Sequence, residues 1–381
     1  MRRAPRPPPP PPPPDLAGAT LHGLDVSYFT GKVEAFLRYK EIAVTRVELT
    51  TRGFTAVGKR TGLAQMPALE LADGRWMSDS TPIIECIDRN YPGGPVLPAD
   101  PLQLFFSQML EDYADEWLWR PALYYRWAFA PDARLLSHRI ASEMMTDIPL
   151  PLAVRRWLIN RRQFKRYIAG DGITAENRAH QEEIYARNLA FLQAMLVQRP
   201  FLLGARPTLA DFGFFASMFR HFGLDPTPSR IMRDTAPAVY EWLGRMWNAR
   251  ASQVAGTLVA PGSIPEDWRP VLREIGRTYL PYLNANAAAF ARRAKSFDVT
   301  IEGYAYHLPV HRYRVWCLER VQELFTALPA REKLQAEVIL RDLGAFEGLF
   351  AQADARAGFD PGRQAPFFDP ASVWLPMVLG S

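Results

Sequence analysis

The sequence predicts a small α/β domain followed by an all-helical domain, with a further, mostly helical segment behind them. Strand and helix signals alternate over residues 17–95, as expected for a mixed sheet with helices on its faces. A proline-rich linker follows at residues 95–101, and helical periodicity without strong strand signals occupies residues 102–250. With 381 residues the chain is too long for one compact core, which agrees with two domains and an extension.

Residues 1–16 are predicted to form a disordered tail. An unbroken run of prolines ends at Pro14 and favours polyproline II. The run follows basic residues rather than an apolar stretch, so the segment does not have the pattern of a signal peptide. We interpret it as a tail without a site, in preference to a ligand for an SH3-type domain.

Residues 17–95 are expected to form one compact domain. Helical periodicity places Val33, Phe36 and Leu37 on one face of its first helix. The Asp73-Gly74 turn joins its last two strands. Its strands and helices, with a loop between the second strand and the third, are expected at residues 19–26, 28–40, 44–49, 68–71, 75–77 and 80–91. This order of elements is the thioredoxin-like arrangement.

Residues 102–250 are expected to form a helical bundle, and residues 251–381 a mostly helical extension of unknown role. In the bundle, helices are expected at residues 102–127 and 175–197, from Leu209 onward and near Pro237. In the extension, helices are expected at residues 268–294 and 331–355, a hairpin at residues 297–306 around Gly303, and irregular structure from Gly358 onward.

The composition indicates an ordinary globular protein of a reducing compartment. Hydrophobic residues make up 48% of the chain and charged residues 22%. No apolar run reaches the roughly 18 residues that span a bilayer. Only two cysteines are present, Cys86 and Cys317, which excludes a disulfide scaffold and predicts a cytoplasmic location. We interpret Cys86, inside an expected helix, as a small buried residue rather than a nucleophile.

The charge pattern and the histidines do not indicate a nucleic-acid-binding site or a metal site. The formal net charge is +5, and no nucleic-acid-binding motif accompanies it, so no nucleic-acid partner is predicted. Pro309 between His307 and His311 prevents a helical ligand pair, so no metal site is predicted. One dense basic run suits the solvated face of a helix, with a site for an anionic partner as the alternative; it contains Arg155, Arg156, Arg161, Arg162, Lys165 and Arg166.

Three short segments of the α/β domain point to one ligand site. Pro67, directly before the third strand, suits a cis bond that would expose the N–H and C=O of Met66 to an extended peptide ligand. Ser80 is expected to cap a helix whose free N–H groups suit a ligand carboxylate. A hydroxyl near Ser27, at the first strand-to-helix junction, could donate a hydrogen bond to a thiolate and favour the charged form.

The order and spacing of these segments resemble the N-terminal domain of the glutathione transferases. In that family the residue before a cis-proline pairs with the backbone of glutathione, which implies this role for Met66 and Pro67. An acidic residue followed by serine holds the γ-glutamyl carboxylate, which implies this role for Asp79 and Ser80.

The resemblance also implies groups for the sulfur and for the glycine carboxylate of glutathione. Ser27 is ranked first for the sulfur, before Tyr28 and Thr30, because it lies between the strand and the helix, where Thr30 is expected to be the cap. The proline that often follows the catalytic serine or cysteine is Tyr28 here, and no cysteine stands at this place, which favours conjugation over mixed-disulfide chemistry. Lys59 or Arg60 would hold the glycine carboxylate.

The second domain resembles the same family. The segment at residues 201–204 leads to Thr208, and Asp211 three residues later can form a capping box with it. Family members carry this pattern at the start of the core helix of their helical domain, where its role is folding. Tyr113 and Trp117, four residues apart on one helical face, are the candidates to line the site of an apolar second substrate between the domains. The alternative is that these aromatic side chains belong to the core of the helical domain, as aromatic residues at helical spacing usually do.

The resemblance covers about residues 19–250 and implies a glutathione transferase that adds the glutathione thiolate to an apolar electrophile, a detoxification reaction. Glutathione would be a co-substrate, and no metal or organic cofactor is implied. One alternative is a non-catalytic binding or scaffolding relative, which the extension of residues 251–381 favours somewhat. Another is a glutathione-dependent isomerase or dehalogenase. The habit of the family implies a homodimer.

Overall fold

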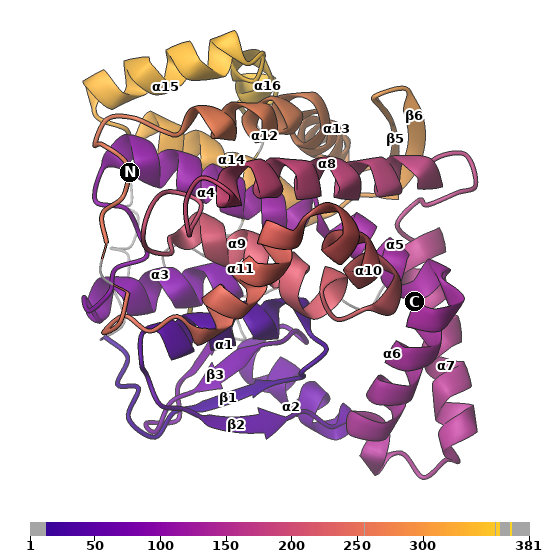
Figure 1. The fold of residues 1–381 in the computed structure, drawn as a ribbon. Helices are drawn as coiled ribbons and strands as arrows, with labels where there is room; N and C mark the ends of the chain where they lie inside the picture. The colour runs from indigo at the N-terminus through magenta and orange to yellow at the C-terminus, as the bar shows by residue number, and fades with distance from the viewer. Residues whose placement is uncertain (1–12, 255, 355, 359–365, 368–381) are drawn as a thin grey trace, which may run out of the picture.

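A computed structural model of the chain describes residues 13–254, 256–354, 356–358, 366 and 367. The α/β domain is built on a four-stranded sheet in the order β2-β1-β3-β4 (Figure 1). β1 pairs with β2 in parallel and with β3 antiparallel, and β3 pairs antiparallel with β4. The strands are β1 (Thr20–Gly23), β2 (Thr45–Glu48), β3 (Ala68–Glu70) and β4 (Trp76–Ser78). This is the predicted thioredoxin-like sheet.

Two of the three helices of this domain were predicted, α1 (Tyr28–Tyr39) and α3 (Ser80–Asn90). The third, α2 (Thr51–Thr61), occupies the segment expected to be a loop. Its threonines and glycines are poor helix formers, and only Val57 and Thr61 of its side chains are buried, so the pattern is weak. Caps at both ends of α2 offset this low helix propensity. The Thr50 hydroxyl accepts the N–H of Gly53 at 3.1 Å, and Gly62 ends the helix at φ 75°.

The α/β domain begins before residue 17, its predicted start. Leu16 is buried, and its N–H donates to the Tyr91 hydroxyl at 3.1 Å, so the chain has already joined the domain there. The predicted polyproline conformation falls on residues 1–12, outside the described residues, except for its last two prolines.

The helical domain follows as predicted, with more helices than the sequence pattern resolved. The stretch expected as one helix at residues 102–127 is two, which meet at Trp117 and Leu118. α9 lies at the centre, packs against α4 and α1, and has every side chain buried. The helices are α4 (Pro101–Glu116), α5 (Trp119–Ala128), α6 (Ala130–Glu143), α7 (Leu152–Phe164), α8 (Arg178–Leu196), α9 (Leu209–Ser217), α10 (Pro226–Thr235) and α11 (Pro237–Asn248).

The predicted capping box begins α9. Asp211 accepts the backbone N–H of Thr208 at 2.9 Å, the reciprocal half of the box is also present, and the other Asp211 oxygen accepts the N–H of Leu202 at 2.9 Å. Asp211 is fully buried, so this carboxylate joins the start of α9 to the segment before it.

The extension is mostly helical, as predicted, and it contains the predicted hairpin, formed by β5 (Ser296–Ile301) and β6 (Tyr304–Pro309). Its helices are α12 (Arg269–Glu274), α13 (Leu280–Ala291), α14 (Arg312–Thr326), α15 (Ala330–Asp342) and α16 (Phe346–Phe350). The sequence prediction missed α14 and joined α15 to α16, which Gly344 separates at φ 68°. Most of the irregular segment expected from Gly358 onward lies outside the described residues.

The extension lies against the helical domain (Figure 1), and its buried side chains belong to the same core. Phe325 of α14 packs on Phe105 of α4 with ring centroids 5.7 Å apart, and the Tyr279 hydroxyl donates to Asp112 of α4 at 2.7 Å. α14 and α15 therefore cover one side of α4. Within the described part of the chain, no helix combines the length and the apolar character needed to cross a membrane.

Candidate functional site

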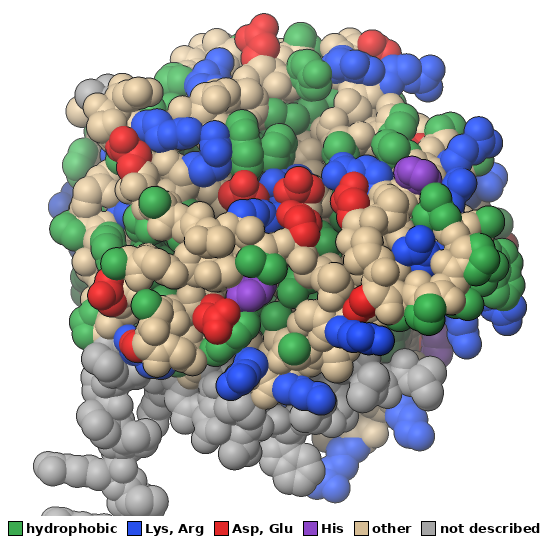
Figure 2. All heavy atoms as spheres, turned by 90° about the horizontal axis from the view of Figure 1, so that it is seen from below, with side chains coloured by type: hydrophobic (Ala, Val, Ile, Leu, Met, Phe, Trp, Pro, Cys, Tyr) green, Lys and Arg blue, Asp and Glu red, His purple; other side chains and the backbone are tan. Residues whose placement is uncertain are grey.

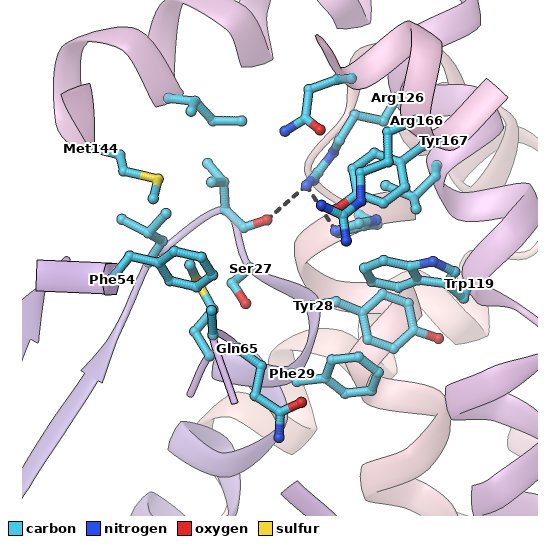
Figure 3. Close-up of a pocket in the computed structure, with 18 of the residues that line it drawn as sticks. Ser27, Tyr28, Phe29, Phe54, Gln65, Trp119, Arg126, Met144, Arg166 and Tyr167 are labelled. Atoms are coloured by element: carbon cyan, nitrogen blue, oxygen red, sulfur yellow. Dashed lines mark hydrogen bonds between the residues drawn. The ribbon is translucent and has the colours of Figure 1, made fainter. Parts of the chain in front are cut away.

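A cavity of about 590 Å³ lies between the α/β domain and the helical domain. Six predicted site residues from three separate segments line it, namely Ser27, Tyr28, Met66, Pro67, Asp79 and Ser80. Its lining is mostly apolar, and Figure 3 shows part of it, with Phe54 and Met144 on one side and Trp119 and Tyr167 on the other.

Ser27 lies at the junction of the first strand and the first helix, as predicted. It is the N-cap of α1, with its Oγ accepting the N–H of Thr30 at 3.3 Å. The prediction that Thr30 is the cap is wrong, because the helix begins three residues ahead of it with Tyr28. Thr30 is fully buried behind the junction and does not line the cavity.

A buried arginine of α5 fixes the backbone beside Ser27. Arg126 donates from Nη1 to the carbonyl of Val26 at 2.7 Å and to Nε2 of His221 at 2.7 Å. It also makes a bidentate pair with Asp225, at 2.8 and 2.9 Å, and donates to the carbonyl of Arg220. All five donors of the guanidinium are used, so Arg126 positions the junction and is not available to a ligand. Its charge and burial lower the pKa of His221 well below the usual value.

Tyr28, the second candidate for the sulfur contact, turns its hydroxyl away from the cavity. The ring is buried, and the hydroxyl donates to the carbonyl of Ala114 in α4 at 2.5 Å. Figure 3 shows this hydroxyl pointing away from Ser27. Burial raises the pKa of Tyr28 well above its usual value. The ranking of Tyr28 as an alternative thiol donor is therefore not supported, and Ser27 remains.

The Met66–Pro67 bond is cis and directly precedes β3, as predicted. No partner among the described residues takes up the backbone N–H or C=O of Met66. Both groups are therefore available to an extended ligand that adds to this edge.

Asp79 and Ser80 lie at the start of α3, but the N-cap is Asp79 rather than Ser80. The N-cap position is Asp79, with φ 73°, and Ser80 is the first helical residue, so the prediction that Ser80 is the cap is wrong. Asp79 Oδ2 accepts a hydrogen bond from the Tyr313 hydroxyl of α14 at 3.0 Å. Burial raises the pKa of Asp79, while this hydrogen bond and the nearby Lys32 oppose the rise. Sequence reasoning missed Tyr313 because it missed α14.

The structure does not bring the residues predicted to hold the glycine carboxylate to the cavity. Lys59 and Arg60 lie on α2 rather than in a loop, are exposed, and do not line the cavity. The polar side chain that this segment supplies is Gln65, next to Met66 (Figure 3).

The residues predicted for the second substrate do not line this cavity either. Tyr113 and Trp117 are 0% and 1% exposed, and they pack against Tyr279 of the extension rather than lining the cavity. Tyr113 and Trp117 do share a face of α4, but that face belongs to the core. The apolar wall comes instead from α1, α2 and α5–α7, and it includes Phe29, Phe54, Trp119, Leu123, Trp127, Ile140, Met144, Ile159 and Tyr167.

A buried charge cluster lies under the floor of the cavity. Lys32 of α1, fully buried, bonds Glu111 at 2.5 Å and Asp115 at 2.5 Å, both on α4, and the hydroxyl of Thr81 at 3.2 Å. The two carboxylates raise the pKa of Lys32 although burial opposes them, and burial raises the pKa of Asp115 well above its usual value. The cluster joins α1 to α4 and so fixes the two domains against each other.

The two cysteines lie outside the cavity, on α3 and α14. Cys86 is half-buried on α3 and Cys317 is buried on α14; burial raises the pKa of both thiols. No group of three or more potential metal ligands occurs among the described residues.

Known proteins match this chain in both domains. Residues 21–95 match the family model described as "Glutathione S-transferase, N-terminal domain", and residues 159–249 match "Glutathione S-transferase, C-terminal domain".

Three solved structures illustrate the likeness. The β-etherase LigF from Sphingobium sp. strain SYK-6 is 20% identical, with 60% of this chain and 94% of that chain covered and a TM-score of 0.43. The tau class glutathione S-transferase of mango, Mangifera indica, is 17% identical, with 61% and 89% covered and a TM-score of 0.39. FzlA from C. crescentus is 16% identical, with 67% and 92% covered and a TM-score of 0.41. The structural matches carry no argument about activity. The chain therefore contains the N-terminal and C-terminal domains of the glutathione S-transferase family, over residues 21–95 and 159–249 and in the order that the sequence predicted.

Proposed function

We propose that this protein binds glutathione in the cavity between its domains and adds the glutathione thiolate to an apolar electrophile. The observation that carries the proposal is the convergence of two groups on one cavity. One is the backbone edge of Met66, which has no partner among the described residues, and the other is the hydroxyl of Ser27. The first suits the peptide backbone of glutathione and the second its sulfur.

The chemistry follows from the surroundings of Ser27. Its Oγ accepts the N–H of Thr30 and can still donate its own proton, so it can stabilise a thiolate without ionising. With an aryl halide, the thiolate attacks the ring carbon, the carbon–sulfur bond forms, and halide leaves from the same carbon. The thiol proton passes to solvent. The apolar wall of α5–α7 would hold the ring beside the sulfur.

A non-catalytic glutathione-binding protein is the second candidate. The observation that favours it is the position of Tyr313, a residue of the extension. Its hydroxyl donates a hydrogen bond to the Asp79 carboxylate, at the end of the cavity that we propose for the γ-glutamyl group. A glutathione-dependent isomerase or dehalogenase would use the same glutathione contacts. A detoxification role, a cytoplasmic location and a homodimer are further parts of the proposal, and sedimentation at several concentrations tests the last.

Titration calorimetry with glutathione tests binding, and thiolate absorbance of the bound ligand tests activation. We expect binding together with a lowered thiol pKa, followed by release of chloride from 1-chloro-2,4-dinitrobenzene. Lys59→Ala is the matched control, because this exposed lysine lies outside the cavity and its loss should change neither quantity. Binding with an unshifted thiol pKa would support the non-catalytic protein, and no binding would exclude both.

A further inference from the structure

The segment around α7 carries an unusual combination of side chains on its outer surface. Residues 148–170 contain six lysines and arginines and no aspartate or glutamate. Half of the large hydrophobic side chains that are exposed in the described part of the chain lie within residues 150–164. They are Leu150, Val154, Trp157, Leu158 and Phe164, and Trp157 and Phe164 are 55% and 51% exposed.

These hydrophobic side chains form one stripe. On α7, Val154, Trp157 and Leu158 are three or four residues apart and therefore share a face, with Arg161 and then Phe164 continuing it. Ile159 faces the opposite way and is buried. In Figure 2, hydrophobic side chains lie among lysine and arginine side chains on the side of the molecule where Figure 1 places α6 and α7.

A groove between α6 and α7 adjoins this stripe. Its volume is about 720 Å³, and Trp127, Trp157 and Phe164 contribute apolar surface to it. Four cations line the same groove, Arg134, Arg156, Arg161 and Lys165, and no carboxylate among the described residues pairs with any of them. Arg161 instead lies over the Trp157 ring, 5.4 Å from its centroid. Unpaired cations beside exposed rings and aliphatic side chains suit a ligand that is both anionic and apolar.

We propose that this face of α7 docks the protein on an anionic membrane surface, without crossing it. Trp157, Leu158 and Phe164 would enter the boundary between headgroups and acyl chains, and the four cations of the groove would pair with lipid phosphates and carboxylates. Charge complementarity identifies the partner as anionic. The exposed aliphatic residues distinguish a bilayer from a nucleic acid, which would meet cations and aromatic rings without needing Val154 or Leu158.

The proposal does not depend on glutathione chemistry. Trp157, Leu158 and Phe164 do not line the cavity between the domains, so their replacement should leave glutathione binding unchanged. The groove and the cavity share Trp127, which is therefore left out of the variants.

Vesicle co-sedimentation of the full chain tests the proposal. We expect binding to vesicles of phosphatidylcholine with about one third phosphatidylserine or phosphatidylglycerol, and little binding to phosphatidylcholine alone. Raising the salt from about 0.1 M to about 0.5 M should weaken the binding at least fivefold. Equal binding to both vesicles, or none to either, would overturn the proposal, as would a preference for single-stranded RNA over anionic vesicles at the same salt.

Two double variants separate the hydrophobic contribution from the charge. Trp157→Ser with Phe164→Ser, and Arg161→Gln with Lys165→Gln, should each reduce binding to anionic vesicles about tenfold. Leu334→Ser with Val338→Ser is the matched control, because these side chains on α15 are 64% and 59% exposed and lie outside the basic segment. Thermal melting shows whether each variant is folded. If the control loses as much binding as the α7 variants, or if the α7 variants bind like the parent, α7 is not the docking surface.

Discussion

The hydroxyl of Tyr313 donates to Oδ2 of Asp79 at 3.0 Å, across 234 residues of sequence. Asp79 belongs to the glutathione-transferase-like domain and Tyr313 to the extension. Both line the cavity, so the extension supplies part of the site's lining. The charged or titratable groups near the Asp79 carboxylate include Tyr313, Cys317 and Arg320 from α14, Lys32 from α1 and Glu111 from α4.

Tyr313→Phe should weaken glutathione binding by about threefold to tenfold, because the hydrogen bond that orients and stabilises the Asp79 carboxylate is lost while the ring remains. Burial already raises the pKa of Asp79, and loss of the bond raises it further. The ionised carboxylate would then be lost at a higher pH, so the defect should grow as the pH falls. Calorimetry between pH 5 and 8 measures this. Tighter binding in the variant would mean that Tyr313 blocks the site.

Ser27→Ala should raise the pKa of bound glutathione by about one unit and cost about 1 kcal/mol of stability, since Ser27 is also the N-cap of α1. Tyr28→Phe is the comparison. It removes the bond to Ala114, so it should lower stability by about 1 kcal/mol and leave the thiol pKa unchanged. Thiolate absorbance measures the first quantity and denaturant unfolding the second. A raised thiol pKa in Tyr28→Phe alone would reverse the assignment.

Lys32→Met should destabilise the fold by about 3–5 kcal/mol at neutral pH, because Glu111 and Asp115 would be left without their cation in a buried position. The loss should be smaller at pH 5. Burial already raises the pKa of Asp115, so its carboxylate accepts a proton more readily as the pH falls. Denaturant unfolding at the two pH values measures both effects. Lys59→Met, at an exposed position, should unfold like the parent at each pH.

Asp211→Ala should cost about 1–3 kcal/mol without changing the ligand site, because the N–H groups of Thr208 and Leu202 lose their acceptor. A melting temperature equal to that of the parent would contradict this role of the capping box.

Asp211 also makes a pH-dependent contribution to the free energy of unfolding. Burial raises the pKa of Asp211 to about 6, so between about pH 4 and pH 6 the folded state holds a proton that the unfolded state has released. This contribution to stability is full below about pH 4 and is lost as the pH rises through 6. Asp211→Asn lacks it, so its stability deficit relative to the parent should shrink from pH 4 to pH 7. A constant deficit would show that Asp211 does not titrate in this window.

The sequence correctly predicted those features of the fold and the site that depend only on residues close together in the chain. Ser27, the Met66–Pro67 step and the Thr208–Asp211 box depend on neighbouring residues, and the structure places each at the predicted junction. α2 was missed because its threonines and glycines are weak helix formers that the rest of the domain holds in place.

The structure departs from the expected placement of site residues where that placement depends on the packing of distant helices. Tyr113 and Trp117 have the spacing of a helical face, but whether that face meets a cavity or the core depends on α13 of the extension. Lys59 was placed by its distance along the chain from Pro67, and a helix in that interval turned it outward. Arg126 and Tyr313 reach the site from the other domain and from the extension, where no local motif marks them.

The position of α14 in the sequence also has a consequence for folding during translation. On the ribosome the N-terminal domains can fold first. The face of α4 that Phe325 later covers, and the Asp79 carboxylate that Tyr313 later bonds, are then still open to water. The cavity therefore acquires the part of its lining that Tyr313 supplies only after α14 has been synthesised, and shorter nascent chains expose the apolar face of α4 that Phe325 later covers. Chaperones that bind exposed apolar surface would find their target there, and a premature stop codon upstream of residue 313 would leave that exposure permanent.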